Sequence, residues 1–132
     1  MERILVPVAP GELVDKLTIL EIKSERIQDS AKRANVAREL NALQDVWTVH
    51  GKGAEAPDVA DARQRLRSIN EELWDIEDAI REREANRDFG QRFVELARAV
   101  YLTNARRAAV KREINEAFGS DLVEEKSYQP YD

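Results

Sequence analysis

The chain has no cysteine, and this absence excludes disulfides, thiol catalysis and zinc sites with sulfur ligands. It also has only one histidine, His50, so a transition-metal site is not expected, although carboxylates leave a Mg²⁺ site open. We therefore expect no bound cofactor. The lack of cysteine also fits a reducing compartment.

Long apolar runs are missing as well. No segment approaches the roughly 20 apolar residues of a membrane-spanning helix. The apolar run in "MERILVPVAPGE" is too short for a signal peptide, and Pro7 and Pro10 interrupt it. These features predict a cytoplasmic protein without membrane insertion. The net charge of −5 argues against a nucleic-acid partner, because phosphate binding needs a concentrated basic surface.

Glycine and proline are scarce in this chain of 132 residues, with five and four copies, so long stretches are free to be helical. Apolar residues at steps of three and four predict helices over about residues 10–28, 30–49, 58–85 and 89–118. The clearest seam contains Val59, Ala62, Leu66, Ile69, Leu73, Ile76 and Ile80. A short connection makes the last two helices an antiparallel hairpin, whereas "GKGAEAP" predicts a loop before them. We therefore predict one all-α domain, an antiparallel helical bundle with one long hairpin.

The two ends of the chain do not fit the helical pattern. The segment "RILVPV" is rich in β-branched residues and is typical of a short strand, whereas "LVEEKSYQPYD" contains proline and tyrosine and is not helical. Because a lone strand needs a partner, it would pair with the carboxyl-terminal tail or with the same strand of a second subunit. A symmetric homodimer is therefore expected.

The first predicted helix carries apolar residues on two sides, so it is expected to touch two neighbours. A leucine seam occupies one side. The opposite side carries Asp15, Ile19, Ile22 and Arg26, and the positions between the two sides carry Glu12, Lys16 and Lys23. A simpler interpretation is that Glu12 and Lys16 form an exposed i,i+4 pair, worth about 0.3–0.5 kcal/mol.

The last predicted helix has two polar residues, Thr103 and Arg107, within its apolar seam. A guanidinium facing that seam needs hydrogen-bond acceptors, so a carboxylate is expected to approach Arg107. Glu77, Glu12 and Asp15 are the candidates. The pattern predicts a polar cluster in which Lys16, Lys23 or Arg26 lies beside Glu77 and Arg81. Two structural alternatives are a buried ion-pair network and an arginine whose stem packs while its head reaches water.

Charge is segregated between the two long helices. The segment "EELWDIED" holds five acids in eight residues, whereas residues 91–112 hold six basic residues and one Glu. Pairing across the hairpin explains this pattern, and a groove in which arginines face an anionic ligand is the alternative. No catalytic residue is assigned. The predicted binding residues are Asp15, Lys16, Lys23, Arg26, Glu77, Arg81, Asn104, Arg107 and Lys111.

Three blocks of the sequence together resemble a family of short bacterial proteins without an established activity: "PGELVDKLTILEIKSERI", "LWDIEDAIREREANRDFGQRFVELARAVYLTNARRAAVKREIN" and "EEKSY". The likeness spans nearly the whole chain. Members of that family often occur near, or fused to, machinery for cell-surface polysaccharides. The resemblance therefore implies a bacterial source and a non-catalytic accessory role in an envelope-polysaccharide pathway. It places within the family's motif blocks Glu12, Asp15, Lys16, Lys23, Glu77, Asp78, Arg81, Asn104, Arg107 and Lys111.

Two enzyme families show a weaker likeness. Asp15 and Arg26 match an Asp and a terminal Arg in the first helix of all-helical chorismate mutases, but the downstream Lys and carboxylate do not follow at the expected spacing. All-helical nucleotide pyrophosphatases bind Mg²⁺ through acidic motifs on adjacent helices; "EELWDIED" resembles one motif, and the second is missing. The alternative function is thus an enzyme or binding protein for a phosphorylated or carboxylated metabolite. The leading hypothesis is a non-catalytic binding or accessory module in an envelope-polysaccharide pathway, with a protein or a small anionic ligand as the possible partner.

Overall fold

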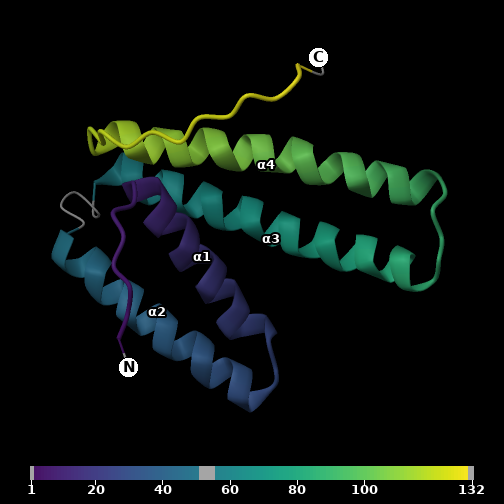
Figure 1. The fold of residues 1–132 in the computed structure, drawn as a ribbon, viewed down its shortest axis with the longest axis horizontal. Helices are drawn as coiled ribbons and strands as arrows, with labels where there is room; N and C mark the ends of the chain where they lie inside the picture. The colour runs from purple at the N-terminus through teal and green to yellow at the C-terminus, as the bar shows by residue number, and fades with distance from the viewer. Residues whose placement is uncertain (1, 51–55, 131–132) are drawn as a thin grey trace.

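A computed structural model describes residues 2–50 and 56–130, and every regular element within them is an α-helix. The helices are α1 (Pro10–Arg26), α2 (Ser30–His50), α3 (Pro57–Ala85) and α4 (Gln91–Ala117) (Figure 1). Their ends lie within two residues of those expected from the sequence. Most of the loop predicted at residues 51–57 lies outside the described residues. The predicted all-helical bundle is confirmed.

Helices α3 and α4 form the long antiparallel hairpin that the sequence predicts (Figure 1). The chain reverses between them, where Arg87 adopts a left-handed backbone conformation with φ of 52°. Arg83 and Asp88 close this turn with an ion pair of 2.8 Å. The seams of both helices then meet along the hairpin, and Leu66 and Ile114 are completely buried there.

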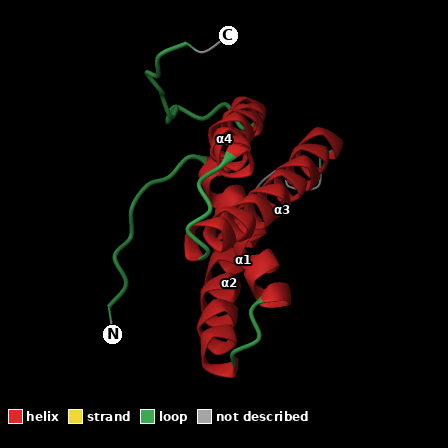
Figure 2. Ribbon diagram, turned by 90° about the vertical axis from the view of Figure 1, so that its right-hand side faces the viewer, coloured by secondary structure: helices red, strands yellow, loops and turns green. Residues whose placement is uncertain are grey.

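Helix α1 lies at the centre of the molecule, in contact with each of the other three helices. Its side chains Val14, Leu17 and Ile22 are at most 1% exposed, as expected for a helix with apolar residues on two sides. Helix α2 packs chiefly on α1, and its Trp47 also contacts the ring of Phe118 at the end of α4, so α1 and α2 form a second hairpin set against the first (Figures 1 and 2). The position of α1 across α3 and α4 is what brings its polar residues to the hairpin.

The predicted amino-terminal strand is wrong for the described residues, none of which belongs to a strand. Residues 2–9 are extended, and Ile4 and Leu5 are 91% and 90% exposed. The tail cannot pair with this segment because the two leave the helices in different directions (Figure 1). β-Branched residues favour an extended backbone, but a strand also needs hydrogen bonds from a neighbour.

A close backbone contact seats the start of α1 on α4. The Gly11 backbone N–H donates to Asn115 Oδ1 at 2.7 Å, which satisfies one of the free N–H groups of the first turn. A Cβ atom on Gly11 would lie 2.4 Å from the backbone oxygen of Lys111, so only glycine fits. Pro10 suits the first helical position, where its missing N–H is not needed. The contact fixes α1 beside Lys111.

We expect Gly11→Ala to destabilise the protein by about 1–3 kcal/mol, because the added methyl group forces α1 away from α4. The direction of the change in unfolding free energy distinguishes this contact, because Gly→Ala inside an ordinary helix stabilises a protein by roughly 0.5–1 kcal/mol. Urea unfolding followed by circular dichroism measures the effect. Gly90→Ala is the matched control, because its Cβ would meet only Asp88 Oδ1 at 3.4 Å. An equal or smaller loss at Gly11 would contradict the close contact.

Candidate functional site: a buried ion pair beside a basic groove

The centre of the site is the carboxylate of Asp15 on α1, whose residue is 1% exposed. Arg107 on α4 donates to it through Nε, at 2.9 Å from Oδ1, and through Nη2 to Oδ2. Asn70 on α3 adds a hydrogen bond from Nδ2 to Asp15 Oδ1 at 2.9 Å. The sequence-based expectation that a carboxylate approaches Arg107 is confirmed. Of the three candidates, Asp15 is the partner and Glu77 is not.

Thr18 completes the buried network. Its hydroxyl donates to the backbone oxygen of Asp15 at 2.8 Å and accepts a hydrogen bond from Asn70 Nδ2 at 2.9 Å. The structure leaves no buried side-chain nitrogen or oxygen without a partner in the ranges it describes. Three helices therefore share one saturated polar cluster inside an apolar core, which is the arrangement that lets a charge be buried.

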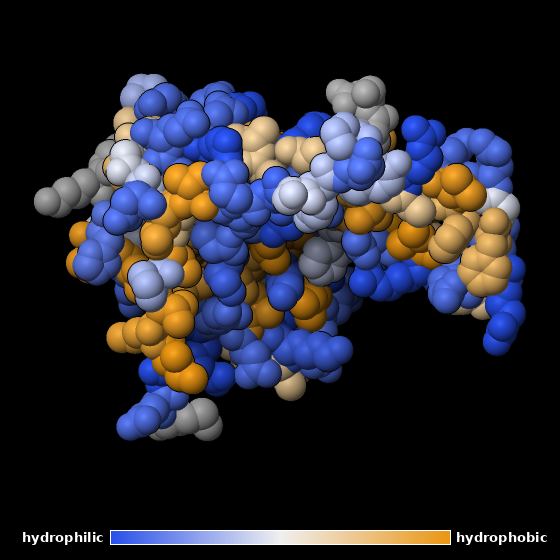
Figure 3. Space-filling view, turned by 45° about the horizontal axis from the view of Figure 1, so that its top comes forward, coloured by the Kyte–Doolittle hydropathy of each residue, from blue (hydrophilic) through white to orange (hydrophobic). Residues whose placement is uncertain are grey.

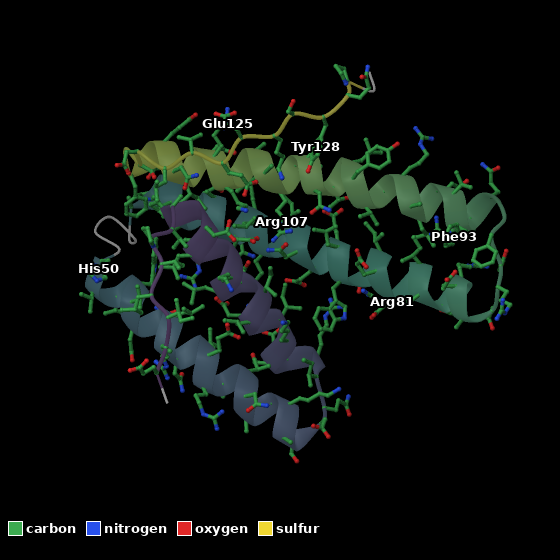
Figure 4. All side chains as sticks on the ribbon, viewed as in Figure 1. His50, Arg81, Phe93, Arg107, Glu125 and Tyr128 are labelled. Atoms are coloured by element: carbon green, nitrogen blue, oxygen red, sulfur yellow. The ribbon has the colours of Figure 1, made fainter. Side chains whose placement is uncertain are left out.

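Arg107 connects this cluster to the surface. The hydrogen bond to Asp15 is the main cause that raises the pKa of Arg107, and it outweighs the burial that would lower it. The side chain is 28% exposed, and its Nη1 donates to Asn104 Oδ1 at 3.3 Å. Figure 4 shows Arg107 where α1 meets the hairpin. One edge of the guanidinium is thus fixed by Asp15, while another borders solvent.

Lys111, one turn further along α4, is held in a similar way. Its Nζ lies 2.8 Å from Glu12 Oε2 and 3.3 Å from Glu124 Oε2, and its side chain is only 11% exposed. Burial works to lower the pKa of Lys111, but the hydrogen bond with Glu12 and the neighbouring carboxylate charges raise it overall. The simpler interpretation of Glu12 as a partner of Lys16 is therefore not supported, since Glu12 forms an ion pair with Lys111.

A groove of about 670 Å³ opens beside these two cations, between α4 and the carboxyl-terminal tail. Its walls combine three cations, one carboxylate, two tyrosines and two side-chain amides. Figure 4 shows Tyr128 on the tail, along the outer side of α4. The lining residues are Tyr101, Asn104, Ala105, Arg107, Ala108, Lys111, Glu124, Lys126, Tyr128 and Gln129.

A second hollow of about 330 Å³ lies between α1, α3 and α4 and gathers several predicted site residues. Lys23, Glu77 and Arg81 line it together with Asn104 and Arg107, which also line the groove. Arg81 pairs with Glu77 on its own helix at 3.2 Å, with 71% of the Arg81 side chain exposed. The predicted cluster is therefore assembled in part, but its Glu77–Arg81 pair is a surface pair, not a partner of Arg107.

Two predicted residues lie elsewhere. Lys16 is exposed on α1 and lines neither hollow. Arg26 donates to Asp75 Oδ1 at 2.6 Å and stacks over the ring of Trp74 at 5.7 Å, so it faces α3 alone. Asp15 and Arg26 thus have different partners.

The tail residues Glu124, Lys126 and Tyr128, which line the groove, were not among the predicted site residues. The block "EEKSY" was the available signal, but an extended segment has no periodicity that predicts what it contacts. Glu12 was also left out of the predicted binding set, although it holds Lys111. The structure adds these groups because it places the tail along α4 (Figure 1).

Neither a metal cluster nor a membrane span is found in the parts of the chain that the structure describes. No group of three or more His, Cys, Asp or Glu side chains there could hold a metal ion. None of the helices in residues 2–50 and 56–130 has the length and apolar character needed to cross a membrane.

We expect Arg107→Met to destabilise the protein by about 3–5 kcal/mol, because it leaves the Asp15 carboxylate buried without a counter-charge. Adding Asp15→Asn removes that charge and should restore much of the loss, which a double-mutant cycle of urea unfolding measures. Arg106→Met is the matched control: its pair with Glu72 is half-exposed, so its loss should stay within about 1 kcal/mol. Similar losses for Arg107→Met and Arg106→Met would contradict the role of the buried pair.

Comparison with known proteins gives one result at the level of the family. No curated protein and no solved structure matches the chain. One family model matches residues 4–131, so it spans all four helices, most of the extended amino-terminal segment and nearly all of the tail. The chain therefore belongs to the family of unknown function DUF6165.

Proposed function

We propose that this chain is a non-catalytic binding module that holds a small anionic ligand in the groove between α4 and the tail. The observation that carries the proposal is the gathering of Arg107, Lys111 and Lys126 around one groove whose lining contains a single carboxylate, Glu124. Guanidinium and ammonium groups are the side chains that bind carboxylates and phosphates.

Each of the two cations on α4 is held in place by an ion pair with a carboxylate. Asp15 holds Arg107 and Glu12 holds Lys111, and both carboxylates belong to α1, the central helix. Such pairs reduce the net charge, but they also fix the donor groups in place before a ligand arrives. Preorganised donors lose less side-chain freedom on binding. The groove therefore suits a ligand recognised by directed hydrogen bonds as well as by charge.

The same charges argue for binding and against acid–base catalysis. The pKa values of Arg107 and Lys111 are raised, so both groups stay protonated at neutral pH. The hydrogen bond with Lys126 is the main cause that lowers the pKa of Glu124, so this group stays ionised. A general acid or base works best when its pKa lies near the operating pH. Arg107, Lys111 and Glu124 thus each stay in one protonation state near neutral pH.

The resemblance to bacterial proteins near polysaccharide machinery supplies the proposed setting. It supports a role as an accessory module in an envelope-polysaccharide pathway in the cytoplasm of a bacterium. Tyr101 and Tyr128 add flat apolar surfaces to the groove, so the ligand is expected to carry a ring or chain beside its anionic group.

A thermal-shift screen with nucleotides, sugar nucleotides, chorismate and Mg²⁺ tests this function. One class of anionic metabolite should raise the melting temperature, and above the dissociation constant the rise should grow with the logarithm of the ligand concentration, as binding to the native state requires. A flat response across all anionic classes would contradict the proposed function, and an interacting protein would then be the partner to seek.

Lys126→Gln localises any response to the groove. Lys126 is exposed, so its loss should change the unfolding free energy by at most about 0.5 kcal/mol while weakening the stabilisation by the anion. Lys32→Gln, an exposed lysine on α2, is the matched control and should leave the stabilisation intact. Equal weakening by both substitutions would place the anion outside the groove.

We also propose that the chain forms a homodimer through its amino-terminal segment. Ile4, Leu5 and Val6 are 91%, 90% and 67% exposed, which is unusual for adjacent aliphatic residues. Figure 3 shows apolar residues, coloured orange, on the surface of the molecule. An extended segment with free N–H and C=O groups is also a template for pairing with the same segment of a second copy.

Light scattering at micromolar concentration should therefore return about twice the 15.1 kDa of the single chain. Leu5→Asp should shift the particle towards the monomer, because it places a charge where the copies meet. Val49→Asp, at a 69% exposed position on α2, is the matched control and should leave the dimer intact. A monomeric wild-type particle would contradict the proposed dimer.

A further inference from the structure

The carboxyl-terminal tail places a carboxylate where an anionic ligand would bind. Glu124 lies between two lysines of the groove, with Oε2 at 3.3 Å from Lys111 Nζ and Oε1 at 3.1 Å from Lys126 Nζ. Arg112 on α4 adds a hydrogen bond from Nη2 to the backbone oxygen of Glu124 at 3.3 Å. Glu124 therefore satisfies the lysines that the proposed function assigns to the ligand.

The attachment of the tail to the helices is weak. Every residue from 121 to 130 is exposed, so no apolar side chain of the tail is buried against α4. The ion pairs Lys111–Glu124 and Arg112–Glu125 join the tail to α4 at distances of 3.3 and 3.4 Å. Segments with few buried contacts open at low free-energy cost. Gly119, with φ of 63°, begins the segment in a conformation that favours glycine.

We infer that the tail is a displaceable internal ligand, in which Glu124 occupies the anion position of the groove until a ligand replaces it. The inference rests on the proposed function, and it adds how that site is regulated. The incoming anion takes over the contact of Glu124 with Lys111, and Glu124 leaves that position while Lys126, on the same tail, stays in the wall of the groove. Because the closed tail lowers the fraction of binding-competent molecules, it weakens the apparent affinity.

Substitution of Arg112 tests this inference through the direction in which the anion affinity changes. Arg112 contacts Glu124 and Glu125 of the tail but does not line the 670 Å³ groove. Removing its positive charge should weaken anion binding if charge alone mattered, since the field at the groove becomes less positive. If the tail competes with the anion, the same change loosens the competitor and strengthens binding. The two explanations predict opposite effects.

The experiment measures the affinity of inorganic pyrophosphate for the full-length chain by isothermal titration calorimetry. Glu124→Gln and Arg112→Gln should each bind about twofold to fivefold more tightly than wild type, as expected when a competing surface ion pair is lost. Arg98→Gln, an exposed arginine elsewhere on α4, is the matched control and should not bind more tightly. Pyrophosphate should also increase the mobility of the backbone amides of residues 122–125, which lose the contact of Glu124 with Lys111, in ¹⁵N relaxation measurements.

The possible results distinguish a failure of the displaceable tail from a failure of the proposed anion groove. Weaker binding by Arg112→Gln, with tail amides unaffected by pyrophosphate, would overturn the inference and leave the anion groove in place. Equal affinity of wild type, Glu124→Gln and Arg112→Gln for pyrophosphate, with weaker binding by Lys126→Gln, would also overturn the inference and leave the anion groove in place. If pyrophosphate binds none of the variants and the metabolite screen is also flat, both the function and the inference fail.

Discussion

The burial of the Asp15 carboxylate is the constraint on which the arrangement of the helices depends. A carboxylate at 1% exposure needs a counter-charge and further hydrogen-bond donors, and here they come from Arg107 on α4 and Asn70 on α3. Those partners belong to the two arms of the hairpin. Helix α1 can therefore satisfy its own charge only when it crosses both arms at one position along their length.

Apolar packing and the buried pair have different roles in this arrangement. Leu17, Leu66 and Ile114 are completely buried and contribute hydrophobic free energy, but aliphatic surfaces tolerate many similar packings. The ion pair tolerates few, because a shift of one helical turn would leave Asp15 without Arg107. The partly buried pair of Arg67 with Glu21, and its pair with the exposed Glu25, also depend on that register. Gly11 allows the register because it permits the close approach of α1 to α4.

The sequence predicted the helices well because their apolar residues repeat at helical spacing, and the need of Arg107 for a carboxylate followed from its place in a seam. Its partner could not be chosen among Glu77, Glu12 and Asp15, since a helical projection does not specify where two helices cross. The amino-terminal strand failed because β-propensity is local and a strand requires a neighbour. A groove with arginines was among the alternatives, but the tail residues of its wall were not in the predicted site, because the contacts of an extended tail with Lys111 and Arg112 leave no periodic pattern.

The site thus combines groups of very different rigidity. Arg107 cannot turn fully towards a ligand, because leaving Asp15 would strand a buried charge, so only its remaining edge beside Asn104 faces the groove. Lys111 is restrained in the same sense by Glu12. The opposite wall, with Glu124, Lys126 and Tyr128, is exposed and lies outside the core. Any change of shape on binding must therefore come from the tail, while the cations of α4 keep the positions that the core imposes on them.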